Sequence, residues 1–390
     1  MAMWTRRELI KAVGAASAAA AVLPANATAT VGPEDRWDVF PEAHRALRIL
    51  FIGGTGFIGP HMVRRAQARG HSVTLFNRGR TNPHLFPDVE KLVGDRDGGL
   101  DVLRGGSWDA VIDTSGYIPR VVRDSAELLR ETVHRYLFIS TGDVYADFEE
   151  IGLDEDYTLD TMEDPTIEDP GRFYGPLKVL CERAVLETYP DRCTILRPGW
   201  IIGAGDYNSI SPYWPMRIHH GGTVLAPGDP TDPVQIIDPH DLAAFVIKIL
   251  EEDINGIYNT VGPASPLTMA ELLYGIRAVT DSSVDFTWVP AGFLMSMDVA
   301  AMTDLPIWFP PLDDYPTPAP FEPGAKGFHQ MSGARAIAAG LSFRPLAQTA
   351  RDVIDEYLSR DEDWSSTPRR FGLSLDREAE VLAAWRASGR

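Results

Sequence analysis

Tyr174 and Lys178 are spaced four residues apart, which suits proton transfer to and from a hydroxyl group. Residues at this spacing share one face of a helix, so the Lys178 ammonium can lie beside the Tyr174 phenol. An unperturbed phenol has a pKa near ~10, and a neighbouring positive charge favours the phenolate and lowers that pKa. Pro176 fits a helix that begins about here, because the first turn lacks intrahelical N–H partners. The alternative is an ordinary surface pair at a helix start.

Thr141 ends an apolar run over residues 136–139 and is followed by Gly142 and Asp143. The ends of strands in parallel sheets point at the ligand crevice. We therefore expect the Thr141 hydroxyl to hydrogen-bond a substrate oxygen while Tyr174 moves the proton. Asp143 is predicted to contact the substrate from the same strand end.

A glycine-rich passage, GGTGFIG at 53–59, directly follows the apolar run 48–52. Glycines are needed where the backbone turns tightly and where it approaches a pyrophosphate. A helix beginning near Phe57 offers free N–H groups and a positive dipole end to phosphates. The passage predicts a dinucleotide site, although a simple strand-to-helix turn could carry the same loop. The predicted contacts are Gly53, Thr55, Gly56, Phe57, Ile58 and Gly59.

These motifs, in this order, resemble those of the extended short-chain dehydrogenase/reductases, or NAD-dependent epimerase/dehydratases. The resemblance runs from about residue 48 to about residue 358 and rests on GGTGFIG, ISTGDVY, YGPLK, LRPGWIIGAGD and GLSFRP. It implies that Tyr174 is the catalytic acid/base, that Lys178 orients the nicotinamide ribose, and that Thr141 assists the substrate oxygen. Pro198, in the fourth motif, is assigned to the cofactor site. The resemblance also implies a homodimer that pairs through helices, which is common in that family.

The residues after the second predicted strand bear on the choice of cofactor. NAD sites usually place an acidic residue about 20 positions after the glycines, to bind the ribose 2′-hydroxyl. Here Asn77 and Arg78 stand at that place. A guanidinium binds a 2′-phosphate bidentately, so the sequence favours NADP, with NAD as the alternative. Other cofactor contacts are predicted at Asp95, Thr114, Ser115 and Gly116.

The later part of the chain is rich in aromatic residues and poor in basic ones. Between Gly203 and His329 the Lys and Arg residues are Arg217, Lys248, Arg277 and Lys326. A nucleotide sugar carries a pyrophosphate that generally needs basic partners, so we expect a neutral small-molecule substrate that stacks on aromatic rings. Many of these rings will instead belong to the core. The predicted substrate contacts here are Tyr207, Tyr213, Trp214 and Arg217.

The overall charge and the sparse cysteines exclude several classes of partner. The 390 residues carry a net charge of −19, which argues against binding to nucleic acid or to an anionic membrane surface. Cys181 and Cys193 stand far from any metal-like cluster and are expected to be small buried packing residues. The pair His219-His220 lacks a clustered carboxylate or cysteine partner, so no metal site is predicted.

The N-terminus has the pattern of an export signal. Thr5-Arg6-Arg7 begins a twin-arginine sequence, and an alanine-rich apolar run at 12–23 and a small-residue cleavage site follow. The apolar run is too short to span a bilayer comfortably, and an alanine-rich first helix is the alternative. We therefore expect a periplasmic or extracellular protein, exported already folded, with no stable membrane association after cleavage.

Strands and helices alternate along the rest of the chain, which predicts an α/β fold with a Rossmann-type doubly wound parallel sheet. The family resemblance implies in addition a smaller, interleaved C-terminal substrate domain. The expected division assigns the signal to 1–29, a lead-in to 30–46 and the dinucleotide-binding domain to 47–199, completed by about 234–258. The substrate domain takes 200–233 and 259–358, and a C-terminal tail takes 359–390.

Together these residues predict an NAD(P)-dependent epimerase or oxidoreductase acting on a secondary alcohol or ketone, such as that of a neutral sugar or glycoside. Hydride would pass between the carbinol carbon and the nicotinamide while Tyr174 moves the hydroxyl proton. Two alternatives remain open: an NADP-dependent reductase of an apolar or aromatic ketone, and a non-catalytic NADP-binding or sensor protein.

Overall fold

The computed structural model describes residues 43–206, 210–311, 326–360, 362–366 and 370–389. The predicted export signal at 1–29, most of the lead-in at 30–46, and Tyr207 lie outside these ranges. Among the described helices, none has the length and apolar character needed to cross a membrane.

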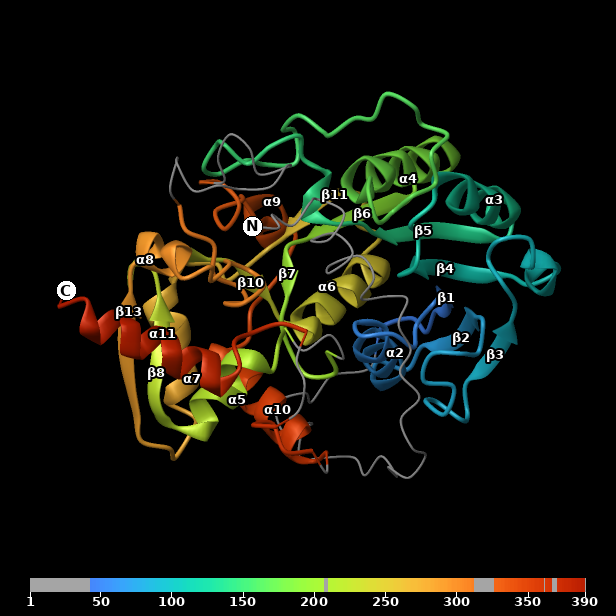
Figure 1. Cartoon of the computed structure of the whole chain (residues 1–390). Coiled ribbons are helices and arrows are strands. Elements are labelled where there is room, and N and C mark those ends of the chain that lie inside the picture. Colours follow the sequence, from blue (N-terminus) through green and yellow to red (C-terminus); the bar gives the residue numbers. More distant parts are fainter. Residues whose placement is uncertain (1–42, 207–209, 312–325, 361, 367–369, 390) are drawn as a thin grey trace.

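A seven-stranded sheet of strands β3-β2-β1-β4-β5-β6-β11, in that spatial order, forms the centre of the larger domain (Figure 1). Every neighbouring pair is parallel, so the predicted doubly wound parallel sheet is confirmed. The strand order reverses between β1 and β4, and ligands bind at such a switch point. The strands are β1 (Arg48–Ile52), β2 (Ser72–Asn77), β3 (Glu90–Val93), β4 (Trp108–Asp113), β5 (Val133–Ile139), β6 (Cys193–Pro198) and β11 (Gly256–Thr260).

Helices cover both faces of this sheet, which explains why its central strands are apolar throughout. Ile49 and Phe51 of β1 pack into the core beneath one helix pair, whereas Leu50 and Ile52 pack into the core on the opposite face. The first pair is α2 (Gly59–Ala68) and α6 (Pro239–Glu251), and the second is α3 (Pro119–Leu129) and α4 (Tyr174–Thr188). The 3₁₀ helices η3 (Leu100–Leu103) and η4 (Gly142–Val144) follow the ends of β3 and β5.

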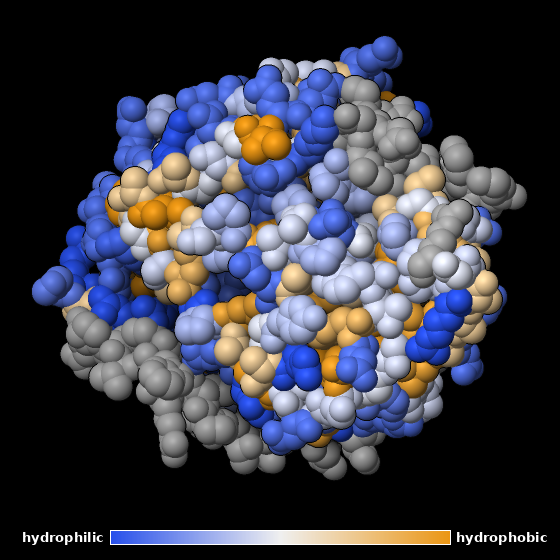
Figure 2. Space-filling model, turned by 90° about the vertical axis from the view of Figure 1, so that its left-hand side faces the viewer, coloured by the Kyte–Doolittle hydropathy of each residue, from blue (hydrophilic) through white to orange (hydrophobic). Residues whose placement is uncertain are grey.

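The smaller domain is built from segments on both sides of α6 and β11, around a separate apolar core. It uses three short strand pairs, β7 with β10, β9 with β12, and β8 with β13. On the face that this domain presents in Figure 2, apolar side chains are scattered among polar ones. Its elements are β7 (Trp200–Ile201), α5 (Tyr213–His220), β8 (Gly222–Pro227), β9 (Pro233–Val234), β10 (Ile236–Ile237), β12 (Leu267–Thr268), α7 (Met269–Arg277), β13 (Val284–Val289), α8 (Ala291–Ser296), α10 (Leu346–Leu358) and α11 (Leu375–Ala387). The short helix α9 (Ala334–Ala338) instead packs beside β11, and its Ala336 lies in the core of the larger domain.

Within the segment predicted to be a C-terminal tail, 359–390, helix α11 is instead part of the smaller domain. Val381 and Leu382 of α11 lie in that domain's core. Glu378 is 3 % exposed; its carboxylate accepts a hydrogen bond from Arg217 Nε at 2.5 Å and another from the Leu225 backbone N–H at 2.8 Å. This contact could not be predicted from the sequence, because the ion pair joins residues 161 positions apart.

We predict that Glu378→Ala will strongly destabilise the protein. Removing one partner of a buried ion pair leaves an uncompensated charge and typically costs about 3–5 kcal/mol. The measurement is the free energy of unfolding from denaturant titration. Glu380→Ala is the matched control, since Glu380 lies on the exposed side of the same helix and such positions change stability by less than about 0.5 kcal/mol. Equal effects of the two substitutions would contradict the structural role of Glu378.

Candidate active site

The glycine loop between β1 and α2 uses its glycines for backbone geometry and for close contacts. Gly53 and Gly54 have φ of +103° and +83°, in the left-handed region that favours glycine. A Cβ at Gly59 would lie 2.5 Å from the carbonyl carbon of Gly54, so the start of α2 could not approach the loop with any larger residue. The sequence predicted the helix near Phe57, and it begins two residues later.

The middle of the loop has the features of a phosphate cradle. Gly56 is exposed, and a Cβ there would meet nothing within 4 Å, so nothing in the described protein requires a glycine. Ile58 precedes α2 without a side-chain cap, and the first turn carries no acidic residue. The N–H groups of this turn are therefore not capped by a side chain and suit an anionic ligand. A dinucleotide pyrophosphate fits these residues, in which Gly56 leaves room for its approach.

Three polar side chains fix the loop: Thr114 and Asn77 at neighbouring strand ends, and Asn82 in the connection after β2. Thr114 Oγ1 accepts from the Gly54 N–H at 3.3 Å and donates to the Ile52 carbonyl at 3.1 Å. Asn77 Nδ2 donates to the Gly53 carbonyl at 3.0 Å. Asn82 Nδ2 donates to the Thr55 carbonyl at 2.9 Å. The contact of Asn82 was missed from the sequence, because it joins residues 27 positions apart.

Some of the polar residues predicted to bind the cofactor instead hydrogen-bond the loop, and others are exposed. Ser115 Oγ donates to the Ile52 carbonyl at 3.3 Å, so this hydroxyl, like that of Thr114, holds the loop. Arg78 is exposed directly after Asn77, as is Asp95 after β3. Asp95 Oδ1 accepts from the Asp97 N–H at 3.1 Å within its own turn.

A buried ion pair stabilises the end of β4 beside the loop. Asp113 is fully buried, and its carboxylate takes two hydrogen bonds from Arg96, at 2.9 and 2.5 Å, in bidentate geometry. Tyr136 donates to the same carboxylate at 2.7 Å, and Ser125 contacts Arg96 Nη2 at 2.7 Å. The side chain of Asp113 points into the protein. It acts on the site by fixing the strand end that carries Thr114–Gly116.

Lys178 occupies the same crevice from α4. It is 3 % exposed, and its ammonium donates to the carbonyls of Gly116 at 2.9 Å and Ile139 at 2.7 Å. These bonds tie α4 to the ends of β4 and β5. Burial lowers the pKa of Lys178 to about 8. An ammonium has three donors, and the two carbonyls take two of them, which leaves one for a ribose hydroxyl.

Tyr174 and Thr141 come together because the start of α4 packs closely on η4. A Cβ at Gly175 would lie 2.2 Å from the Asp143 carbonyl oxygen, so only glycine permits this approach. The hydroxyl of Thr141 hydrogen-bonds the Tyr174 phenol and also accepts from the Asp143 N–H at 3.2 Å. The structure thus joins the predicted Tyr174, Lys178 and Thr141 at the carboxyl end of the sheet, with Asp143 beside them.

The electrostatics of Tyr174 differ from the expectation of a lowered pKa. Burial raises the pKa of Tyr174 well above its ordinary value, and Tyr117 and Asp143 add to this, whereas the Thr141 hydrogen bond lowers it. Lys178 does not offset burial, since its ammonium is turned towards the two backbone carbonyls. Tyr117 was also missed from the sequence: its ring centre lies 6.3 Å from that of Tyr174. The protein alone therefore holds Tyr174 as a neutral phenol.

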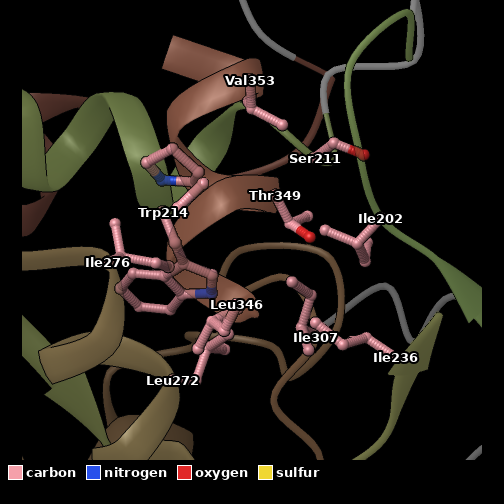
Figure 3. A pocket seen from close by; sticks show the side chains of 12 residues that line it. Ile202, Ser211, Trp214, Ile236, Leu272, Ile276, Ile307, Leu346, Thr349 and Val353 are labelled. Atoms are coloured by element: carbon pink, nitrogen blue, oxygen red, sulfur yellow. The ribbon is translucent and has the colours of Figure 1, made fainter. Parts of the chain in front are cut away.

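The aromatic residues predicted to bind substrate from α5 lie elsewhere. Tyr213 and Trp214 are each 1 % exposed and belong to the core of the smaller domain. Trp214 Nε1 donates to the Pro306 carbonyl at 2.6 Å, and the indole lines a small apolar cavity (Figure 3). Arg217 has all three nitrogens engaged, by Glu378 and by the carbonyls of Gly221 and Thr223. We correct these three assignments: the residues are structural.

A chain of polar groups links the glycine-loop helix to the smaller domain. His61 of α2 contacts His240 of α6 (Nδ1 to Nε2, 3.3 Å), and its Nε2 lies 3.0 Å from the Ala204 carbonyl. His240 Nδ1 lies 2.9 Å from Asp238, which accepts from Thr349 of α10 at 2.5 Å. Burial lowers the pKa of His61 to about 3, so His61 is neutral at ordinary pH. Its Nε2–H can then donate to the carbonyl of Ala204, which belongs to the LRPGWIIGAGD motif.

Within the described ranges, no group of three or more His, Cys, Asp or Glu side chains is placed to hold a metal ion. Both cysteines are free and buried, as expected from the sequence.

Comparison with known proteins assigns the fold to one family. The model of the "NAD dependent epimerase/dehydratase family" matches residues 49–117 and 120–260. Two solved structures that resemble the chain cover most of it. The Bordetella bronchiseptica enzyme WbmH in complex with NAD+ covers 82 % of this chain and 100 % of its own, with 14 % identity and a TM-score of 0.57. The Thermus thermophilus UDP-glucose 4-epimerase complex with NAD covers 80 % and 99 %, with 19 % identity and a TM-score of 0.52.

Curated relatives match the chain over shorter stretches. The chloroplast stem-loop binding protein of 41 kDa b from Arabidopsis thaliana is 26 % identical over 242 residues, 57 % of this chain and 61 % of that protein. The bovine sterol-4-alpha-carboxylate 3-dehydrogenase, decarboxylating, is 30 % identical over 182 residues, 42 % of this chain and 49 % of that protein. The chain thus spans roughly half to three fifths of the length of these relatives.

We predict that His61 makes stability fall as the pH decreases from 6.5 towards 3. In this window the unfolded chain binds a proton at His61, whereas the folded protein, with a pKa of about 3, does not. This contributes about 1.4 kcal/mol per pH unit to the slope of unfolding free energy against pH. Asp241, whose pKa burial raises to about 7, works in the opposite direction.

The measurement is therefore the difference in that slope between wild type and His61→Gln, from denaturant titrations at several pH values. His44→Gln is the control, since His44 is exposed. A His61→Gln slope equal to that of wild type would refute the assignment.

Proposed function

Because the chain belongs to the NAD-dependent epimerase/dehydratase family, we propose that it is an NAD(P)-dependent epimerase or oxidoreductase acting on a secondary alcohol or ketone of a neutral small molecule. The observation that carries the proposal is the convergence of Tyr174, Lys178 and Thr141 at the strand ends beside the glycine loop. Proton transfer at a carbinol needs an acid/base, and Tyr174 has the position and the partners for it.

When bound, the dinucleotide supplies the acceptor and donor of hydride. The protein's own groups do the rest. The N–H groups at the start of α2 and the exposed Gly56 hold the phosphates, and the remaining donor of Lys178 orients the ribose. Thr141 holds the substrate oxygen. Tyr174 takes the hydroxyl proton when the carbinol is oxidised and returns it when the ketone is reduced. A cationic nicotinamide ring near the phenol would lower the pKa that burial has raised.

We propose a neutral substrate, in contrast to the sugar nucleotides named for several structural neighbours. Arg217, one of four basic residues in the region 204–328, is committed to Glu378 in the smaller-domain core. This leaves fewer basic groups for a pyrophosphate. A reductase of an apolar ketone is the second candidate, which the similarity to the sterol dehydrogenase favours.

We further propose that the enzyme is exported through the twin-arginine route and keeps one dinucleotide through many turnovers. Outside the cytoplasm, nicotinamide pools and the enzymes that regenerate them should be absent. An epimerase that removes hydride from a carbinol carbon and returns it to the other face needs no external supply. The cofactor can be loaded before export, because that route carries folded proteins.

A non-catalytic nucleic-acid-binding role is less consistent with these features. One relative is named for stem-loop binding, but the net charge of −19 opposes contact with phosphates. The joint presence of Tyr174, Lys178 and Thr141 at the strand ends also argues against such a role.

We predict that the purified wild-type protein exchanges hydride with neutral secondary alcohols and that Tyr174→Phe does not. Neutral sugars and glycosides, deuterated at a carbinol carbon, are incubated without added cofactor. Deuterium retained at the reacting carbon through many turnovers supports a recycled cofactor.

Tyr174→Phe should bind dinucleotide as wild type does but lose activity about 100-fold or more. Activity above about a tenth of wild type in this variant would exclude Tyr174 as the acid/base. Dependence on stoichiometric added cofactor would exclude recycling.

We predict that Arg78→Ala weakens NADP binding and leaves NAD binding unchanged. Asn77 stands where NAD sites usually carry a carboxylate, its amide is bonded to Gly53, and Arg78 is exposed next to it. A charge-assisted contact to the 2′-phosphate is worth about 1.5–3 kcal/mol, which is roughly a 10- to 100-fold loss of affinity. Titration calorimetry with both cofactors tests this, and Arg80→Ala is the control. Equal losses for NAD and NADP would remove Arg78 from cofactor selection.

A further inference from the structure

A segment far along the chain, residues 326–333, crosses the carboxyl ends of β5 and β6. Three backbone hydrogen bonds fasten it to the loop after η4. The Gly327 N–H donates to the Phe148 carbonyl at 2.8 Å, the Gly152 N–H to Gln330 at 2.8 Å, and the Ser332 N–H to Leu153 at 2.9 Å. The path of the segment beside the catalytic strand ends is therefore fixed by the fold.

Gln235, between β9 and β10, fixes one residue of this segment with both ends of its amide. Its Nε2 donates to the Met331 carbonyl at 2.8 Å, and its Oε1 accepts from the Met331 N–H at 3.1 Å. The Gln235 backbone N–H donates to Nδ1 of the buried His329 at 3.2 Å. Burial lowers the pKa of His329 to about 4, so that nitrogen is free to accept. The backbone of Met331 is thereby held in position and orientation.

The side chain of Met331 points at the catalytic strand ends. A Cβ at Gly142 would lie 3.1 Å from the Met331 Cε, and one at Gly199 would lie 3.6 Å from it. Gly142 follows Thr141 directly, and Gly199 follows Pro198, which is assigned to the cofactor. Met331 is 7 % exposed. Its terminal methyl group therefore lies between two glycines that flank site residues, and Gly142 in particular provides the room it takes.

We propose that Met331 is a specificity-determining residue, whose thioether forms an apolar wall beside the reacting carbon, and that Gln235 is the residue that positions it. This rests on the proposed function and deepens it. A thioether gives a charged or strongly polar substituent no hydrogen-bond donor, and burial of such a group against it is costly. The wall therefore selects an uncharged alcohol or ketone that carries a small apolar or unsubstituted carbon on this side of the carbonyl.

The location of Met331 can be tested without turnover. The full chain, labelled with [methyl-¹³C]methionine, is titrated with NAD or NADP, and the Met331 signal is assigned with Met331→Leu. The nicotinamide ring should shift the Met331 methyl resonance by more than its linewidth. The signal of Met269, fully buried in the smaller-domain core, is the control and should stay in place. A Met331 signal that moves no more than that of Met269 overturns the proposal. Failure of both dinucleotides to bind, measured by calorimetry, overturns the proposed function itself.

The selectivity of the wall is tested by ketone binding to protein loaded with reduced cofactor, read from nicotinamide fluorescence. Met331→Ala should bind acetophenone about tenfold more tightly than wild type does. Its affinity for acetone should stay within about twofold of the wild-type affinity. Gln235→Leu should shift selectivity in the same direction with unchanged cofactor affinity, as expected of a positioning residue. Met295→Ala, at an exposed site on α8, should match wild type. Equal ketone affinities in wild type and Met331→Ala, or no binding of either ketone to either protein, overturn the proposal.

Discussion

The buried ammonium of Lys178 is the constraint on which the candidate site depends. A charge removed from water must find partners in the protein, or its burial is very costly. Here the partners are the carbonyls of Gly116 and Ile139, at the ends of β4 and β5, and the face of the Phe138 ring, 4.2 Å from Nζ. The strand ends and α4 are therefore fixed relative to one another. Tyr174, one turn before Lys178, takes its place beside Thr141 as a consequence.

A second buried charge stabilises the same edge of the sheet. Asp113 raises the pKa of Lys178 and so partly offsets the effect of burial on it, while Arg96 acts in the opposite sense. The bidentate Arg96–Asp113 pair also fixes the end of β4, from which Gly116 reaches Lys178. The two charged groups thus work as one electrostatic unit at the switch point. Tyr174 stays neutral beside this unit because burial raises the pKa of its phenol, and the ammonium of Lys178 is turned towards carbonyl oxygens and not towards the phenol.

The parts of the site that could be predicted from the sequence depend on local geometry. The glycine spacing and the Tyr174–Lys178 spacing specify contacts within one turn or one helix face, so they identified the loop and the catalytic helix. The parts that could not be predicted depend on distant partners. From the sequence, Arg217 was predicted to be a basic group that contacts substrate. Its structural role instead depends on an ion pair with Glu378, 161 residues away. An aromatic residue such as Trp214 packs equally well in a core or a pocket, and its type does not distinguish them. Met331 carries no motif, and only the path of its segment brings it to Gly142, which follows Thr141.

The two domains are coupled through polar groups as well as through the sheet. His61 on α2 lies one turn from the glycine loop, and its contacts run through His240 and Asp238 to Thr349 and Arg344, which carry them into the smaller domain. The Ala204 carbonyl, which His61 also contacts, belongs to the connection between β7 and α5 of the smaller domain. The helix that would hold the phosphates is thus tied to the domain that would hold the substrate.

Because His61 is buried and neutral, its two ring nitrogens act as one donor and one acceptor. A protonated ring would have two donors and could not accept from His240. The alignment of cofactor loop and substrate domain therefore requires the unprotonated imidazole.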